Sequence, residues 1–200
     1  AIRRPDGLVG KPAEAGTDVF AMDTASGSSS IPTWDSGFPV DFRFHRTPGT
    51  SVDWYTGARL MGGGKWLATN SSSAEANIAG TADDSNEGFG TGHDSSWQAW
   101  MWKRHAGFDV VTYNGGFNGS TKTINHSLNN VPEMIWQKNR ASNSSWITYH
   151  KGLNGGTNAW NYSQFLNTSG AEMANAGLMT ETPTSKFLTL SGSNWVNNIS

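Results

Sequence analysis

The histidines of this sequence are the side chains best suited to acid–base or metal chemistry, but they stand apart from one another. The five histidines are His45, His93, His105, His126 and His150. None of them lies in an HExxH motif or forms a close pair at metal-ligand spacing. The 200-residue chain contains no cysteine, which excludes disulfides and thiolate metal sites. We expect the histidines to serve as surface or strand-packing residues.

Two segments contain letters of catalytic motifs without their geometry. His93 and Asp94 are followed by serines, yet adjacent residues of an extended chain point to opposite faces, and no GxSxG elbow is present. Gly62–Lys65 (GGGK) resembles half of a phosphate loop, but Trp66 stands where Ser or Thr would bind magnesium. We interpret both segments as turns, and we predict a non-enzymatic protein without cofactor or metal.

The clustered acids leave one alternative open. Asp83, Asp84 and Glu87 (DDSNEG) could offer several oxygens to calcium, although the EF-hand spacing is absent. The other interpretation is a solvated acidic loop. Glu75 and Glu172 each follow an Ala at equivalent places, where a carboxylate could cap the first turn of a short helix, so we expect them to be structural.

One loop has the composition of a sugar-binding site. In GTNAWNYSQ, Trp160 and Tyr162 lie beside Asn161 and Gln164. Aromatic rings stack on apolar sugar faces, and amides bind hydroxyl groups. We predict Trp160, Asn161, Tyr162 and Gln164 as ligand-binding residues; the alternative is that the rings fill the core or cover a module interface.

The chain also repeats an ordered set of landmarks about 93 residues apart. The paired landmarks are Pro39 with Pro132, Arg46 with Arg140, Leu60 with Leu153, and Ala74-Glu75 with Ala171-Glu172. Leu60 precedes Asn70 by ten residues, whereas Leu153 precedes Asn167 by fourteen, which predicts an insertion in a surface loop of the second copy. A repeated module is typical of scaffolds and multivalent binders.

Alternating apolar residues and abundant turn residues predict an all-β fold of tandem β-sandwich modules, jelly-roll or lectin-like, with short helical turns. We expect strands at 18–22, near Ile31, at 40–46, 96–104, 108–113, near Ile124 and at 133–140, and helical turns at SAEAN and GAEMANAG. The predicted domains are an extended arm at 1–16, a first repeat at 17–105 and a second repeat at 106–200. The second repeat is expected to lack its final strand, so that the native chain continues beyond Ser200.

Charge and hydropathy exclude two classes of partner. The net charge is −2 with 15% charged residues, so the basic surface of a nucleic-acid-binding protein is absent. No apolar run approaches the roughly 20 residues of a membrane span, and we expect no membrane insertion.

A family resemblance follows from several of these segments: GFDVVTYNGG, INHSLNNVPEMIWQKNR, WITYHKGLNGG and FLNTSGAE, with SWQAWMWKRHAGFDVV in the first copy. Together they resemble a repeated domain of uncharacterised function found in virion and tail-fibre proteins of marine phages, including cyanophages. The resemblance implies a structural segment of a phage tail fibre or appendage, located in the virion and assembled in the host cytoplasm. Its expected partners are copies of itself, as a homo-oligomer, other virion proteins and a host-surface glycan used for attachment. Two alternatives are a carbohydrate-binding module and a hydrolase with two carboxylates facing a cleft.

Overall fold

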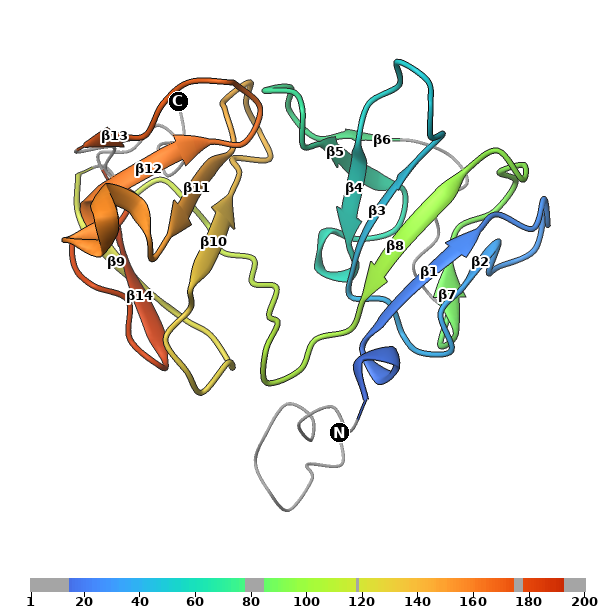
Figure 1. Cartoon of the computed structure of the whole chain (residues 1–200), viewed down its shortest axis with the longest axis horizontal. Helices are drawn as coiled ribbons and strands as arrows, with labels where there is room; N and C mark the ends of the chain where they lie inside the picture. Colours follow the sequence, from blue (N-terminus) through green and yellow to red (C-terminus); the bar gives the residue numbers. More distant parts are fainter. Residues whose placement is uncertain (1–14, 78–84, 118, 175–177, 193–200) are drawn as a thin grey trace. The chain divides into compact units, whose positions relative to one another are not determined.

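The computed structural model describes residues 15–77, 85–117, 119–174 and 178–192, and the protein is all-β (Figure 1). Its strands form four antiparallel sheets. The chain divides into two compact units, one made of residues 1–67 and 76–112, the other of 68–75 and 113–200. In the described part of the chain, no helix is long and apolar enough to cross a membrane.

The first unit contains a six-stranded sheet and a two-stranded ladder. The sheet has the order β1-β8-β3-β4-β5-β6, and β2 pairs with β7 in the ladder. The strands are β1 (Phe20–Thr24), β2 (Trp34–Asp35), β3 (Phe42–Arg46), β4 (Tyr55–Ala58), β5 (Lys65–Ala68), β6 (Ala76–Asn77), β7 (Gly88–Phe89) and β8 (Gln98–Trp102). Two 3-10 turns, η1 (Gly16–Asp18) and η2 (Arg59–Met61), precede β1 and follow β4.

The second unit contains a four-stranded sheet and another ladder. The sheet has the order β10-β11-β12-β13, and β14 pairs with β9. The strands are β9 (Thr121–Asn125), β10 (Met134–Gln137), β11 (Ile147–His150), β12 (Tyr162–Phe165), β13 (Met173–Ala174) and β14 (Phe187–Ser191). The connection between β11 and β12 carries η3 (Leu153–Gly156) and η4 (Ala159–Asn161).

Strand pairing in the two units follows one register. In the first unit, Phe42 of β3 lies opposite Ala58 of β4. In the second unit, Met134 of β10 lies opposite His150 of β11, 92 positions later on both strands. The hairpin β3–β4 therefore has the same register and the same loop length as β10–β11.

The next hairpin keeps its register at a larger offset. Lys65 of β5 lies opposite Asn77 of β6. Tyr162 of β12 lies opposite Ala174 of β13, 97 positions later on both strands. The offset therefore grows by five between the second and third strands, because the second connection holds η3 and η4 where the first holds only η2. The extra residues lie in the loop where the sequence predicts an insertion.

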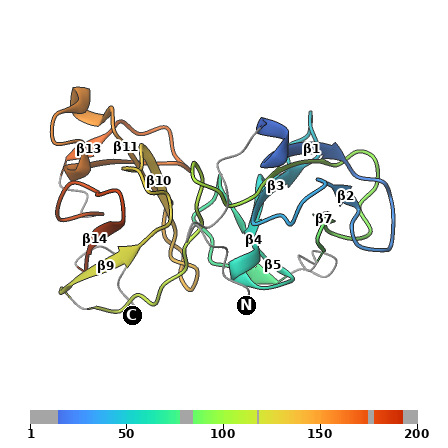
Figure 2. The ribbon, with the colours of Figure 1, turned by 90° about the horizontal axis from the view of Figure 1, so that it is seen from below.

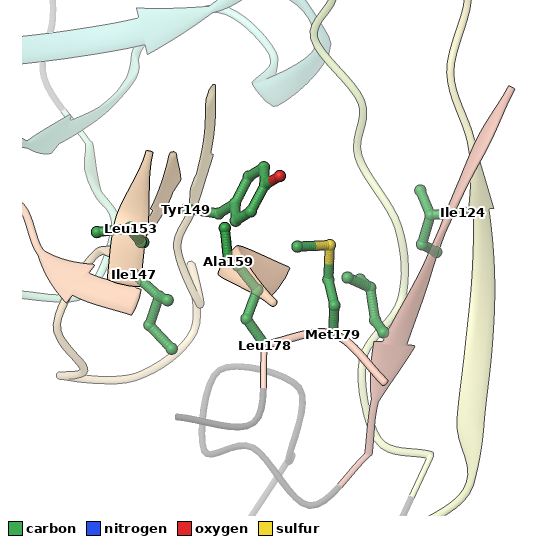
Figure 3. Close-up of a cluster of buried hydrophobic side chains, with 8 residues drawn as sticks. Ile124, Ile147, Tyr149, Leu153, Ala159, Leu178 and Met179 are labelled. Carbon is green, nitrogen blue, oxygen red and sulfur yellow. The ribbon is translucent and has the colours of Figure 1, made fainter. Parts of the chain in front are cut away.

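Each unit has its own apolar core. In the second unit the core lies between the β9–β14 ladder and the four-stranded sheet (Figure 2). Leu178 and Met179 lie between Ile147 of β11 and Ile124 of β9 (Figure 3). In the first unit, the fully buried Trp34 of β2 stacks on Phe89 of β7, with ring centroids 4.7 Å apart, and the apolar residues of β8 complete the cluster.

The strand predicted at 108–113 is absent. The backbone of 108–113 forms only an isolated bridge between Phe108 and His105. The Phe108 ring packs against Trp102 in the first unit, whereas Tyr113 packs on the core of the second. The alternating apolar residues therefore belong to a connection that contributes side chains to two different units, with the division between Thr112 and Tyr113.

The helical turns predicted at SAEAN and GAEMANAG are also wrong over the residues that are described. Ala76–Asn77 and Met173–Ala174 are the short strands β6 and β13. Backbone pairing with β5 and β12 is stronger than the weak helix signal of one turn, whose nucleation is costly. The strand predicted at 18–22 begins at Phe20, since Asp18 closes the turn η1. The arm at 1–16 and the end of the second repeat lie mostly outside the described residues.

A glycine in the β2–β7 ladder provides a stability test. A Cβ on Gly88 would lie 1.9 Å from the carbonyl oxygen of Trp34, which is backbone and cannot move aside. We expect Gly88→Ala to lower the free energy of unfolding by about 2–3 kcal/mol, as overpacking does. Gly63→Ala is the matched control, because nothing lies within 4 Å of its Cβ, and it should change stability by less than about 0.5 kcal/mol. Urea unfolding measures both values, and equal stability of the two variants would contradict the described close approach.

Candidate functional site

The outward face of three neighbouring strands carries a continuous set of large apolar side chains. The register aligns these residues in two rows across β1, β8 and β3: Phe20, Trp102 and Phe42 in one row, and Met22, Trp100 and Phe44 in the next. Met22 is 60% exposed, and the five aromatic side chains are half-buried. We call these six residues the aromatic face.

The rings of the aromatic face contact one another across the strands. The centroid of Trp102 lies 5.0 Å from that of Phe20 and 5.4 Å from that of Phe44. Trp54, which directly precedes β4, extends the set with a centroid distance of 5.3 Å to Trp100. Tilted and edge-on ring pairs at such distances stabilise each other, so the face is held in a fixed arrangement.

A polar row borders the aromatic face. Thr24, Gln98 and Arg46 continue the same strands by two more residues, and their register aligns them. The Thr24 hydroxyl donates to Gln98 Oε1 at 3.1 Å. The Arg46 guanidinium lies 4.7 Å above the Trp54 ring and donates to the Thr50 carbonyl at 2.5 Å. Aromatic rings beside fixed amide and guanidinium groups can bind a sugar ring or the apolar surface of another protein.

The opposite face of β3 is buried and holds two basic side chains. Arg43 is 1% exposed and His45 is 2% exposed. The Arg43 guanidinium lies 4.7 Å above the Phe89 ring, which offsets part of the cost of its burial. The alternation in this strand places Phe42 and Phe44 on one face, but by itself it does not indicate which face is buried.

His45 is enclosed by aromatic rings. The centroids of Trp34, Tyr55 and His93 lie 5.3–5.6 Å from that of His45. Burial, together with the charge of Arg43 and the nearby His93, holds the pKa of His45 well below its usual value. Burial likewise lowers the pKa of His93, whose Nδ1 lies 3.0 Å from the Thr91 carbonyl. Both rings therefore pack as neutral groups at pH 7.

Two of the four residues predicted to bind sugars pack against the core. Trp160 lies in η4 and Tyr162 begins β12, and both half-buried rings pack against the core of the second unit. The Asn161 backbone donates to the Asn158 carbonyl at 2.9 Å, which closes the turn. Gln164 is exposed on β12. The four residues are neighbours in the fold, but the two rings do not stand free as a platform.

The remaining sequence candidates lie in turns or outside the described residues. Asp94 accepts from the Ser96 backbone at 2.8 Å in the turn before β8, and Gly62–Gly64 lie in the connection from η2 to β5. Asp83 and Asp84 fall outside the described residues, and Glu87 is exposed, so calcium binding remains a hypothesis. Among the residues that the structure describes, no group of three or more His, Asp or Glu could hold a metal ion.

A family model described as a domain of unknown function (DUF7483) matches residues 17–200. The chain belongs to this family. No curated protein and no solved structure matches it.

In this DUF7483 chain, the second unit includes a short segment from the first half of the sequence, residues 68–75. The Trp146 indole Nε1 donates to the Ala68 carbonyl at 2.9 Å. The Ala74 backbone donates to Asn143 Oδ1 at 2.9 Å. Sequence reasoning identified Glu75 but not its partner, because no local pattern relates residues 65 positions apart.

Two hydrogen bonds join Glu75, the last residue of this segment, to Arg140. The Glu75 backbone N–H donates to the Arg140 carbonyl at 2.8 Å, and Arg140 Nε donates to the Glu75 carboxylate at 2.5 Å. The loop that carries Arg140 is held by Lys138, whose ammonium donates to the carbonyls of Asn139 and Ser142. Burial lowers the pKa of Lys138 to about 8. The segment 68–75 is therefore recognised through both main chain and side chains.

The buried histidine predicts a pH dependence of stability. Because the pKa of His45 is lowered in the folded state, the unfolded chain binds the extra proton as pH falls below 6.5. We expect the free energy of unfolding to fall by up to about 1.4 kcal/mol per pH unit from this group below pH 6.5, and His45→Gln to flatten that slope. NMR checks the assignment directly: the His45 ring signals should stay constant between about pH 8 and about pH 5. A midpoint near 6.5 would contradict burial of the neutral imidazole.

Proposed function

We propose that this chain is a non-enzymatic structural segment of a phage virion appendage, such as a tail fibre, and that it acts through its outer surfaces. The proposal combines the resemblance of its ordered motifs to repeated domains of phage virion and tail-fibre proteins with the architecture of the two units. In this proposal the chain is located in the virion, and its partners are copies of itself and other virion proteins.

The two units are proposed to be tandem β-sandwich repeats. Support comes from the register of their hairpins, which recurs at offsets of 92 and 97 residues. The two-stranded ladders show the same offsets. Trp34 pairs with Phe89 in the first unit, and the His126 backbone donates to the Lys186 carbonyl in the second. His126 lies 92 positions after Trp34, and Lys186 lies 97 positions after Phe89. A sheet facing a ladder across an apolar core is a small sandwich. Repetition of one such module is typical of extended scaffolds.

The aromatic face is the observation that carries this proposal. Its rings are only half-buried and Met22 is exposed, although burial of large apolar side chains is strongly favourable. Contiguous apolar patches that stay accessible commonly mark interaction sites. Its rings lie on paired strands rather than on mobile loops, so a partner meets a surface that is already organised. We propose that another protein surface of the virion, first of all a second copy of this chain, packs on it.

Carbohydrate binding is the second candidate function. It is favoured by the polar row of Thr24, Gln98 and Arg46 beside the rings, which would supply hydrogen-bonding groups next to a stacking surface. On an appendage, such a site would contribute to host attachment by binding a surface glycan. The loop with Trp160 and Gln164 is a weaker candidate, since its rings pack on the core.

A pair of substitutions on the aromatic face tests the proposal. We expect Phe44→Thr with Trp100→Thr to leave the β-structure intact, because Thr is favoured in strands and both side chains are on the outer face. Self-association should weaken by about tenfold or more, as loss of a central aromatic contact does. Sedimentation equilibrium of the full chain measures it.

Trp136→Thr is the matched control. Trp136 occupies the position on β10 that Phe44 occupies on β3, and it is 38% exposed. The control should retain self-association. If the double variant associates as well as the unchanged chain, the aromatic face is not the contact surface. If affinity electrophoresis shows that the double variant loses retention by a polysaccharide instead, the carbohydrate-binding candidate replaces the structural one.

A further inference from the structure

The segment 68–75 has a counterpart in the second half of the chain, residues 165–172. The hairpins β5–β6 and β12–β13 that flank these segments share one register, so Asn70 corresponds to Asn167 and Glu75 to Glu172. Both segments end in Ala-Glu directly before the second strand of the hairpin. The two segments should therefore present the same recognition groups in the same order.

The two segments differ in what surrounds them. Ala74 and Glu75 are half-buried by their contacts with Asn143 and Arg140. By contrast, every residue from 168 to 174 is exposed. Within the described residues, the Glu172 carboxylate accepts a hydrogen bond from the Asn154 backbone of its own unit at 2.8 Å. One segment has a binding loop and its counterpart is presented to solvent.

The binding loop also has a counterpart. The loop of residues 138–146, between β10 and β11, corresponds in length and register to residues 46–54, which comprise the last residue of β3 and its connection to β4. Each loop ends in a tryptophan directly before the next strand, Trp146 or Trp54. Each region also carries an arginine: Arg140 lies in the loop of the second unit, whereas Arg46 is the last residue of β3 and lies two register positions earlier.

The loop 46–54 is accessible from solvent. Residues 48–51 are exposed, and the hydrogen bonds of Arg46 end on carbonyl groups of its own loop. Ser51 corresponds to Asn143, the side chain that accepts from the Ala74 backbone. A hydroxyl group can accept the same backbone hydrogen bond as an amide oxygen.

We propose that residues 165–172 of one copy of this chain bind the loop 46–54 of a second copy, in the way that residues 68–75 bind the loop 138–146. Glu172 pairs with Arg46 of the second copy, and the Ala171 backbone donates to its Ser51. This inference rests on the self-assembly in the proposed function and names a contact separate from the aromatic face.

The geometry of this contact has a consequence for assembly. Its two sides are different surfaces of the chain, so each bound copy still presents one free segment and one free loop. Contacts of this heterologous kind produce rings or open filaments rather than closed dimers. A single segment of eight residues makes a small interface, and we expect it to be weak between separate chains and effective when many copies are aligned.

Disulfide trapping tests the contact, and the chain is suited to it because it contains no cysteine. One chain carries Ala171→Cys and the other carries Ser51→Cys; the two are mixed at high concentration and oxidised. We expect the mixed dimer to form about tenfold faster than with Thr182→Cys in place of Ala171→Cys, because binding raises the effective concentration of the thiols. Thr182 is an exposed residue of the same unit and is the matched control.

Two further variants separate recognition from chance collision. Ala74→Cys with Asn143→Cys in one chain is the positive control and should close within the chain. Glu172→Arg should reduce trapping to the rate of the Thr182→Cys control, and combining it with Arg46→Glu in the second chain should restore the faster rate. Equal trapping by the Ala171→Cys and Thr182→Cys chains would overturn the inference. If sedimentation still shows self-association in that case, the proposed function stands without this contact; if no association is seen, both fail.

Discussion

The pairing of β8 with both β1 and β3 is the constraint on which the first unit depends. Side chains alternate between the two faces of a strand, so a shift of one residue in this register would exchange the buried and the outward sets. The observed register aligns Phe20, Trp102 and Phe42 on the outer face. It also directs Arg43 and Met101 inward together. The outward aromatic face and the interior that supports it are thus two results of one pairing.

The interior explains why that pairing is maintained although polar groups are buried. Burial of a guanidinium or an imidazole costs free energy unless a partner compensates for it. Here Arg43 lies over the Phe89 ring, and His45 stays neutral among aromatic rings, so neither retains the full cost of an isolated charge. Gly57 leaves the space beside the Arg43 guanidinium, because a Cβ there would lie 1.7 Å from its Nη1. The interior is therefore shaped around Arg43 and discriminates against a shifted register.

Local pattern predicted several of the strands but not their surroundings. Alternation in FRFHR and QAWMW indicates which residues share a face, and the strand predicted at 96–104 is β8, which pairs with β1 and β3. The buried face of β3 could not be read from it, since Phe42 is the more hydrophobic residue yet Arg43 is the one inside. Alternation at 108–113 predicted a strand because a connection that sends Phe108 to one unit and Tyr113 to the other has the same pattern. The aromatic face is formed by three strands, and β8 lies far from β1 and β3 in the sequence. The sequence shows each aromatic residue, but it does not show that these residues lie side by side.

Glu75 and Glu172 show the limit of such prediction most clearly. The two residues have the same neighbours in sequence and the same place in their hairpins, and local reasoning assigned both to helical turns. One is half-buried against Arg140, while the other is exposed, so the difference arises from what lies opposite each segment. The residues of a segment therefore do not decide whether its carboxylate is paired or exposed. That depends on the loop that lies opposite the segment in the fold, which no local pattern describes.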